Sequence, residues 1–134
     1  MRLVSFKKAD GLHIGVITDK GVVDLNLIDP SAPGDLGAVV KEGKIDDIAM
    51  LMNQVGDEVH YQIKDLNLAL PVPSPGKILC LGLNYMDHVA EGPFEKQPYP
   101  AIFMRSATSL LAANKPTVVP SVSETLDYEA ELVV

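Results

Sequence analysis

The fold of the first part of the chain is decided by residues 3–25, LVSFKKADGLHIGVITDKGVVDL. Two apolar runs flank Asp10-Gly11, and a third apolar run follows Asp19-Lys20-Gly21. Asp-Gly between apolar runs is a strong hairpin signal, because both residues tolerate the positive φ angles of a tight turn. The segment therefore predicts a β-meander of three short strands.

The residues after the meander predict a helix, a further strand and a linker. Apolar residues recur at helical spacing before Gly56, at Ile45, Ile48, Leu51, Met52 and Val55. Leucines then alternate with polar or small residues over positions 66–70, which predicts a strand. Three prolines follow within residues 71–75 and mark a linker. We therefore expect a small N-terminal β-meander/helix domain over residues 1–72.

The pattern of apolar and polar residues changes beyond the linker. We expect an apolar strand at residues 78–83, with Cys80 in its core, then a short polar helix, a proline-rich loop and a second strand at residues 101–105. A final strand is expected to include Glu131, and no turn or cap residue ends it before Val134. An edge strand that stops there is the alternative. We expect a β-rich α+β protein in which residues 73–134 begin a second domain that is incomplete at its C-terminus.

Composition limits the partners of the chain. Its 134 residues carry a formal net charge of −7, with a pI near 4.8. Nucleic acids and anionic membrane surfaces are therefore unfavourable partners, and a cation or a neutral small molecule fits better. The single cysteine, Cys80, indicates a reducing compartment. No apolar run approaches the ~18 residues of a membrane helix. These features predict a soluble, cytoplasmic protein without nucleic-acid or membrane partners.

Glu129 and Glu131 are the first candidate site. In a strand they lie on one side, with their Cα atoms about 6.5 Å apart. Two carboxylates at that spacing are stable together if solvent or a cation neutralises them. Paired carboxylates suit hard cations such as Mg²⁺, Mn²⁺ or Ca²⁺. A solvated strand face and a metal site both remain open on spacing alone.

His88 and Glu91 are the second candidate site, and they follow directly on an apolar strand. Asn84 is a suitable N-cap for the short helix, and Asp87 stands where a capping-box carboxylate would be. Three residues apart, His88 and Glu91 share a helix face. A carboxylate beside an imidazole fixes its tautomer and suits it to act as a general base. An exposed pair without chemistry is the alternative.

The order of these segments resembles the fumarylacetoacetate hydrolase family. Residues 76–91, GKILCLGLNYMDHVAE, are similar to the motif that opens the family's catalytic domain. AIFMR at 101–105, TSL at 108–110 and LDYEAEL at 126–132 follow in the family's order. The resemblance covers residues 76–134, and residues 1–73 look like the small N-terminal domain of some members.

The resemblance implies a mixed β-roll catalytic domain, a homodimer, and Mg²⁺ or Mn²⁺ bound beside a small oxo-acid substrate. It assigns metal binding to Glu129 and Glu131, and catalysis to His88 and Glu91. A third metal carboxylate and a catalytic lysine are expected further along the chain. Leu81 stands where some members have an aspartate ligand. Arg105 replaces a frequent lysine, and its role is open.

The activity implied by the resemblance is metal-dependent hydrolysis of C–C bonds in acylpyruvates and related diketo acids. In that reaction the metal polarises the substrate's dicarbonyl end, and His88, held by Glu91, activates water. Two other functions stay open. One is decarboxylation or isomerisation of small oxo-acids on the same scaffold, and the other is a non-catalytic binding or dimerisation module.

Overall fold

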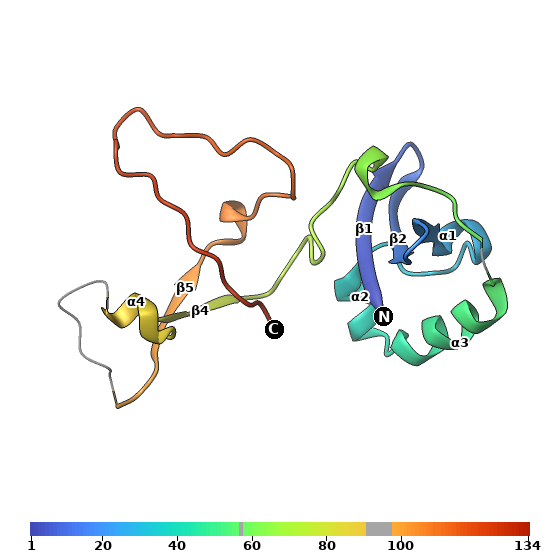
Figure 1. The fold of residues 1–134 in the computed structure, drawn as a ribbon, viewed down its shortest axis with the longest axis horizontal. Helices are drawn as coiled ribbons and strands as arrows, with labels where there is room; N and C mark the ends of the chain where they lie inside the picture. Colours follow the sequence, from blue (N-terminus) through green and yellow to red (C-terminus); the bar gives the residue numbers. More distant parts are fainter. Residues whose placement is uncertain (57, 91–97) are drawn as a thin grey trace.

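A computed structural model of the chain describes residues 1–56, 58–90 and 98–134. It has the expected α+β composition (Figure 1). The strands are β1 (Arg2–Lys8), β2 (Gly11–Ile17), β3 (Val22–Asp24), β4 (Ile78–Gly82) and β5 (Ala101–Arg105). The α-helices are α1 (Leu25–Ile28), α2 (Leu36–Lys41), α3 (Ile45–Val55) and α4 (Met86–Ala90), and short 3₁₀ turns cover Ile63–Asp65 and Ala107–Ser109.

The predicted β-meander is confirmed. β1, β2 and β3 form an antiparallel sheet in that order, and Lys8 pairs with Gly11 across the first turn. Gly11 has φ 144°, a conformation that L side chains rarely adopt. The second turn is closed by Thr18, whose backbone N–H and hydroxyl both donate to the carbonyl of Gly21. Turn chemistry thus sets the register of both hairpins.

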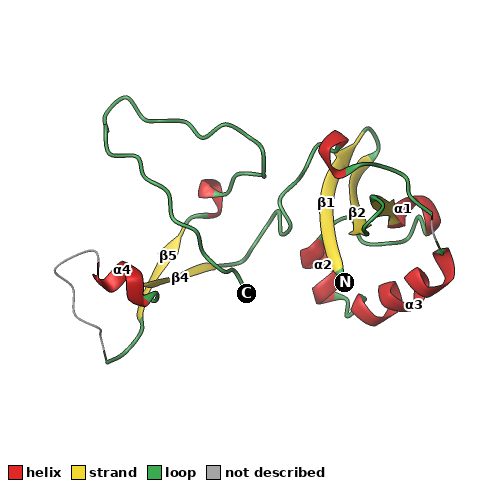
Figure 2. Ribbon diagram, in the orientation of Figure 1, coloured by secondary structure: helices red, strands yellow, loops and turns green. Residues whose placement is uncertain are grey.

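Helices α1, α2 and α3 pack with this sheet around the buried core (Figure 2). The helix predicted from apolar spacing is α3, and Gly56 follows it with φ 66°, a backbone conformation that glycine adopts readily. Helices α1 and α2 were not expected. Their N-caps are Asp24 and Asp35, whose carboxylates accept from the N–H groups of Asn26 and Ala38. The buried core comprises Ile14, Val16, Leu25, Val39 and Ile48.

The prediction of a regular strand at residues 66–70 is wrong. Only a single bridge joins Leu68 to Phe6, although this segment does run along β1, the edge strand of the sheet. The N–H of Lys7 donates to the carbonyl of Asn67, and the N–H of Ala69 donates to the carbonyl of Ser5. Pro71 has no N–H with which to extend the ladder, so the pairing stops there.

β4 and β5 form a separate two-stranded antiparallel ribbon, and both predicted strands are confirmed. Cys80 pairs with Phe103 at the middle of the ribbon. The expected burial of β4 is not found, because Leu79 and Leu81 are exposed and Cys80 is only half-buried. Two strands alone have no second layer to cover them among the described residues.

The final strand predicted around Glu131 is wrong in this structure. Residues 126–134 form no helix or strand, and they run as an exposed extended loop in Figure 2. The apolar pattern favours a strand, but a strand needs a neighbour for its backbone hydrogen bonds. Among the described residues, no strand forms a ladder with this segment.

Candidate functional site

The candidate site is built on the segment that connects β4 to α4. Leu83 directly follows β4 and has φ 53°, an unusual left-handed conformation for a non-glycine residue. This bend turns the chain into α4, whose first hydrogen bond runs from the N–H of Val89 to the carbonyl of Tyr85. The expected cap at Asn84 is therefore wrong by one residue, because Tyr85 precedes the first helical residue, Met86.

His88 lies in α4, so the prediction that this histidine follows the apolar strand on a short helix is confirmed. Asp87 is the acidic residue of the first helical turn, where a negative charge suits the helix dipole. The predicted partner of His88, Glu91, lies outside the described residues. The pairing of His88 with Glu91 stays a prediction.

Glu129 and Glu131 lie in the extended loop at the end of the described chain, and both are exposed. The strand that was expected to align them is absent, so strand geometry does not place their carboxylates on a common face. Near them, the carboxylate of Asp127 accepts from the backbone N–H of Tyr128. The role of the two glutamates in metal binding stays a prediction.

One hydrogen bond brings the two candidate segments together. The hydroxyl oxygen of Tyr85 accepts from the backbone N–H of Leu132 at 3.1 Å. Tyr85 immediately precedes α4, which carries His88, and Leu132 immediately follows Glu131. Residues 47 positions apart are thereby in contact. This role of Tyr85 was not predicted from the motif, in which its hydroxyl group was the available signal.

The fit of the described residues to a divalent cation is incomplete. No three histidine, cysteine, aspartate or glutamate side chains gather into a possible metal site within residues 1–56, 58–90 and 98–134. Hard cations need several oxygen ligands at once. Glu129 and Glu131 provide two carboxylates of suitable chemistry, and no third one joins them in the part of the chain described here.

Arg105 is the last residue of β5. A 3₁₀ turn follows, in which the hydroxyl oxygen of Ser106 accepts from the N–H of Thr108, and the hydroxyl of Ser109 donates to the carbonyl of Ser106. Arg105 pairs in the ladder with Ile78, at the far end of the ribbon from Gly82. The ribbon thus separates Arg105 from the start of α4.

Comparison with known proteins supports the resemblance. Residues 77–134 match the family described as "Fumarylacetoacetate (FAA) hydrolase C-terminal". The chain is 31% identical over 137 residues to "Oxaloacetate tautomerase fahd2, mitochondrial" of Xenopus laevis, covering 98% of this chain and 43% of that protein. It is 30% identical over 139 residues to "Oxaloacetate tautomerase FAHD2A, mitochondrial" of Homo sapiens, covering 100% of this chain and 44% of that protein.

A third relative, "Fumarylacetoacetate hydrolase domain-containing protein 2 homolog" of Dictyostelium discoideum, is 29% identical over 123 residues, covering 91% of this chain and 40% of that protein. The chain belongs to the fumarylacetoacetate hydrolase family. It spans less than half the length of these relatives. Within the described residues, no helix has the length and apolar character needed to cross a membrane.

Proposed function

We propose that the full-length protein carrying this chain is an enzyme that interconverts the keto and enol forms of a small 2-oxo-dicarboxylic acid such as oxaloacetate. The observation that carries the proposal is the match along nearly the whole chain to two proteins named oxaloacetate tautomerase. Isomerisation was the second of the activities that the sequence analysis left open. Because of these relatives, we place isomerisation ahead of C–C bond hydrolysis.

The reaction is a proton transfer. In the enol-to-keto direction one proton leaves the hydroxyl on C2 and one proton is added to C3, while the C2–C3 double bond becomes a C2=O double bond. No water is consumed and no C–C bond breaks. A positioned acid–base group is enough to move the proton, and we assign that role to His88, with Glu91 as the residue that orients it. The position of His88 on a helix directly after β4 supports the assignment.

We further propose that Glu129 and Glu131 contribute to a divalent cation site, with Mg²⁺ or Mn²⁺ as the first candidates and Ca²⁺ as a third. The contact between Tyr85 and Leu132 supports this, because it holds the loop that carries both glutamates beside the start of α4. A bound cation would supply positive charge for the substrate's oxygen atoms. Further ligands have to come from outside the described residues.

A division into two domains, 1–72 and 73–134, is proposed on similar grounds. The family match starts at residue 77, just after the proline-rich segment, and within the described part of the chain the fully buried side chains lie before it. The oligomeric state is proposed to be a homodimer, as the family resemblance implies. The cytoplasm was the expected compartment, whereas two relatives are named mitochondrial, so we propose a reducing compartment of either kind.

A C–C bond hydrolase is the second candidate, because the matching family is described as a hydrolase. The two activities are separated by assaying the full-length protein with Mg²⁺ or Mn²⁺ on two substrates. Oxaloacetate enol is followed by the loss of its ultraviolet absorbance, and a simple acylpyruvate is followed by release of its cleavage products. The proposal expects accelerated ketonisation without cleavage. If the protein cleaves the acylpyruvate at enzymatic rates and leaves ketonisation at the rate seen in buffer, hydrolysis would replace tautomerisation as the proposed activity.

A further inference from the structure

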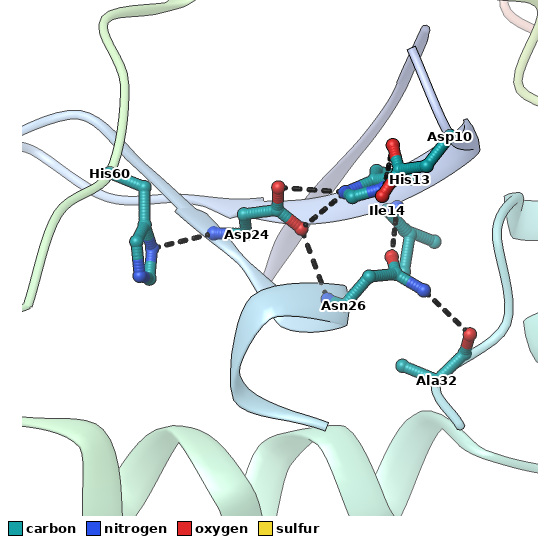
Figure 3. Close-up of polar contacts among 7 residues, drawn as sticks. All are labelled: Asp10, His13, Ile14, Asp24, Asn26, Ala32 and His60. Carbon is teal, nitrogen blue, oxygen red and sulfur yellow. Dashed lines mark hydrogen bonds and ion pairs between the residues drawn. The ribbon is translucent and has the colours of Figure 1, made fainter. Parts of the chain in front are cut away.

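Asp24 has a buried carboxylate at the end of β3. It is fully buried and accepts from two groups, which are shown in Figure 3. One is the N–H of Asn26, which makes Asp24 the N-cap of α1. The other is Nδ1 of His13 on β2, at 3.0 and 2.8 Å from the two carboxylate oxygens. A charged carboxylate in the interior requires such a partner, because water does not reach it.

His13 is contacted by carboxylates on both ring nitrogens. Its Nδ1 faces Asp24, and its Nε2 lies 3.1 Å from Oδ1 of Asp10 in the β1–β2 turn (Figure 3). Ionised carboxylates only accept hydrogen bonds, so both ring nitrogens must carry a proton to make both contacts. The geometry therefore requires the imidazolium form of His13. That cation balances the buried charge of Asp24.

His60 has the opposite requirement. Its Nδ1 accepts the backbone N–H of Asp24 at 3.0 Å, so this nitrogen must be without a proton. Its Nε2 lies 3.1 Å from a carboxylate oxygen of Glu58, and it must therefore carry the proton. The geometry fixes His60 as a neutral imidazole with its proton on Nε2. A second proton would sit on Nδ1 of His60 and face the backbone N–H of Asp24. Two donors cannot form a hydrogen bond with each other.

The bond between His60 and Asp24 holds a segment that covers the open edge of the sheet. β3 is an edge strand in the order β1-β2-β3. Its outer side is covered by residues 60–62: the N–H of Val22 donates to the carbonyl of Tyr61, and the N–H of His60 donates to the carbonyl of Val22. Gln62 adds a bond from its side-chain amide to the carbonyl of Lys20. Without this cover, β3 would present unpaired backbone groups to other strands.

We propose that His13, Asp24 and His60 form a proton-sensitive lock, in which a proton added to His60 releases residues 60–62 from β3. The released segment can bind a proton on His60 that the docked segment cannot bind, so lowering the pH favours release. His13 donates from both ring nitrogens in the docked state, so it has no acceptor nitrogen that an added proton could occupy. The tests below use the interval from pH 7.5 to 5.5, in which an ordinary histidine ring gains a proton.

Other charged groups face the lock from the surrounding elements. Glu58 contacts His60 directly, and Asp10 contacts His13. Lys8 on β1 has a raised pKa, mainly because of its hydrogen bond to Tyr61 and further because of the charges of Asp24 and Asp10. Carboxylates and ammonium groups of these kinds ordinarily titrate outside pH 5.5–7.5. Between pH 7.5 and 5.5, a change in protection is therefore attributed to protonation of histidine.

The first test reads the proton positions directly. Two-bond ¹H–¹⁵N correlation spectra of the 134-residue chain at pH 7.5 distinguish the three forms of each histidine ring. The lock predicts an imidazolium for His13 and a neutral ring with its proton on Nε2 for His60. A proton on Nδ1 of His60, or a neutral His13, would overturn it.

The second test measures release. The protection of the Asp24 amide against hydrogen exchange should fall by about tenfold between pH 7.5 and 5.5, because a solvent-exposed histidine, whose pKa is ordinarily about 6.5, takes up its proton midway through this interval. The Val39 amide, which donates to Asp35 in α2, is the internal reference. His60→Asn is the matched variant, because its amide oxygen can take the place of Nδ1 without titrating.

The expected result is a pH-dependent loss of protection in the parent chain and constant protection in His60→Asn. Equal losses in both chains, or constant protection in the parent, would contradict the lock. If the Asp24 amide of the His60→Asn variant is already unprotected at pH 7.5, this variant cannot serve as the control. The proton positions measured in the parent chain then support or overturn the lock.

Discussion

The hydroxyl oxygen of Tyr85 accepts a hydrogen bond from the backbone N–H of Leu132 at 3.1 Å, across 47 positions of the sequence. This contact joins the loop that carries Glu129 and Glu131 to the start of α4, the helix that carries His88. The two segments that the family resemblance assigns to the active site are thus held side by side.

Tyr85→Phe should free the C-terminal loop. A hydrogen bond typically contributes about 0.5–1.5 kcal/mol, so the protection of the Leu132 amide against hydrogen exchange should fall roughly two- to tenfold. Tyr128→Phe is the control, because Tyr128 is almost fully exposed and lies in the same loop. Unchanged protection in Tyr85→Phe, or an equal loss in Tyr128→Phe, would show that this contact does not hold the loop.

Gly15→Ala should destabilise the N-terminal sheet. A Cβ at this position would lie 2.6 Å from Cγ1 of Val22 and 3.2 Å from Cε1 of Phe6, two fully buried side chains. Overpacking of this kind costs about 1–3 kcal/mol in the free energy of unfolding. Urea unfolding followed by circular dichroism measures it. Gly76→Ala is the matched control, since nothing lies within 4 Å of its Cβ, and equal midpoints for the two variants would contradict the packing described here.

Asp29 should show a low pKa that depends on Ser31. The hydroxyl of Ser31 donates to the Asp29 carboxylate at 2.7 Å and its N–H donates at 2.9 Å, and these two bonds lower the pKa of Asp29 below 3.8. A lowered pKa in the folded state means that the stabilising effect is present above the ordinary aspartate pKa and is lost as the pH falls through the folded one.

Ser31→Ala should raise the pKa of Asp29 toward its ordinary value, because the larger of the two contributions, the hydroxyl bond, is removed. Ser31→Thr retains a hydroxyl and should keep the pKa low. Carbon-detected NMR titration of the Asp29 carboxyl group measures both. The same pKa in Ser31→Ala as in the parent would show that the hydroxyl does not stabilise the carboxylate.

Glu129→Gln should weaken binding of Mn²⁺ to the full-length protein, because it removes a carboxylate charge at nearly constant size. Calorimetric titration gives the affinity, and we expect a loss of at least about tenfold, in line with the few kcal/mol of a lost charged ligand. Glu124→Gln, a change of the same kind on the same loop, is the control. If both variants bind Mn²⁺ as the parent does, Glu129 is not a ligand.

Local signals in the sequence predicted the hairpins, α3 and the β4–β5 strands. The first hairpin turns at Ala9-Asp10, directly before the glycine of the Asp-Gly signal, and the apolar spacing from Ile45 marks one helix face. Helices α1 and α2 were missed because they are only 4 and 6 residues long, too short for a periodic pattern. Their N-caps, Asp24 and Asp35, were the signals that could have revealed them.

Contacts between distant residues could not be read from the sequence. The apolar residues after Glu131 have the composition of a strand, but strand formation depends on a neighbour that pattern analysis does not supply. His13 and His60 had no local setting that marked them, and Asp24 connects them from 11 and 36 positions away. Sequence motifs identify the segments of the candidate site, whereas their contact through Tyr85 is visible only in the structure.

The most direct test of the proposed function is the rate of oxaloacetate ketonisation by the full-length protein and its His88→Ala variant, at saturating Mg²⁺ or Mn²⁺. His60→Asn is the control histidine, since it lies in the N-terminal sheet region outside the candidate site. If His88 moves the proton, His88→Ala lowers kcat by about 10²- to 10⁴-fold, while His60→Asn turns over at the parent rate at pH 7.5. Equal kcat values for His88→Ala and the parent would contradict the account.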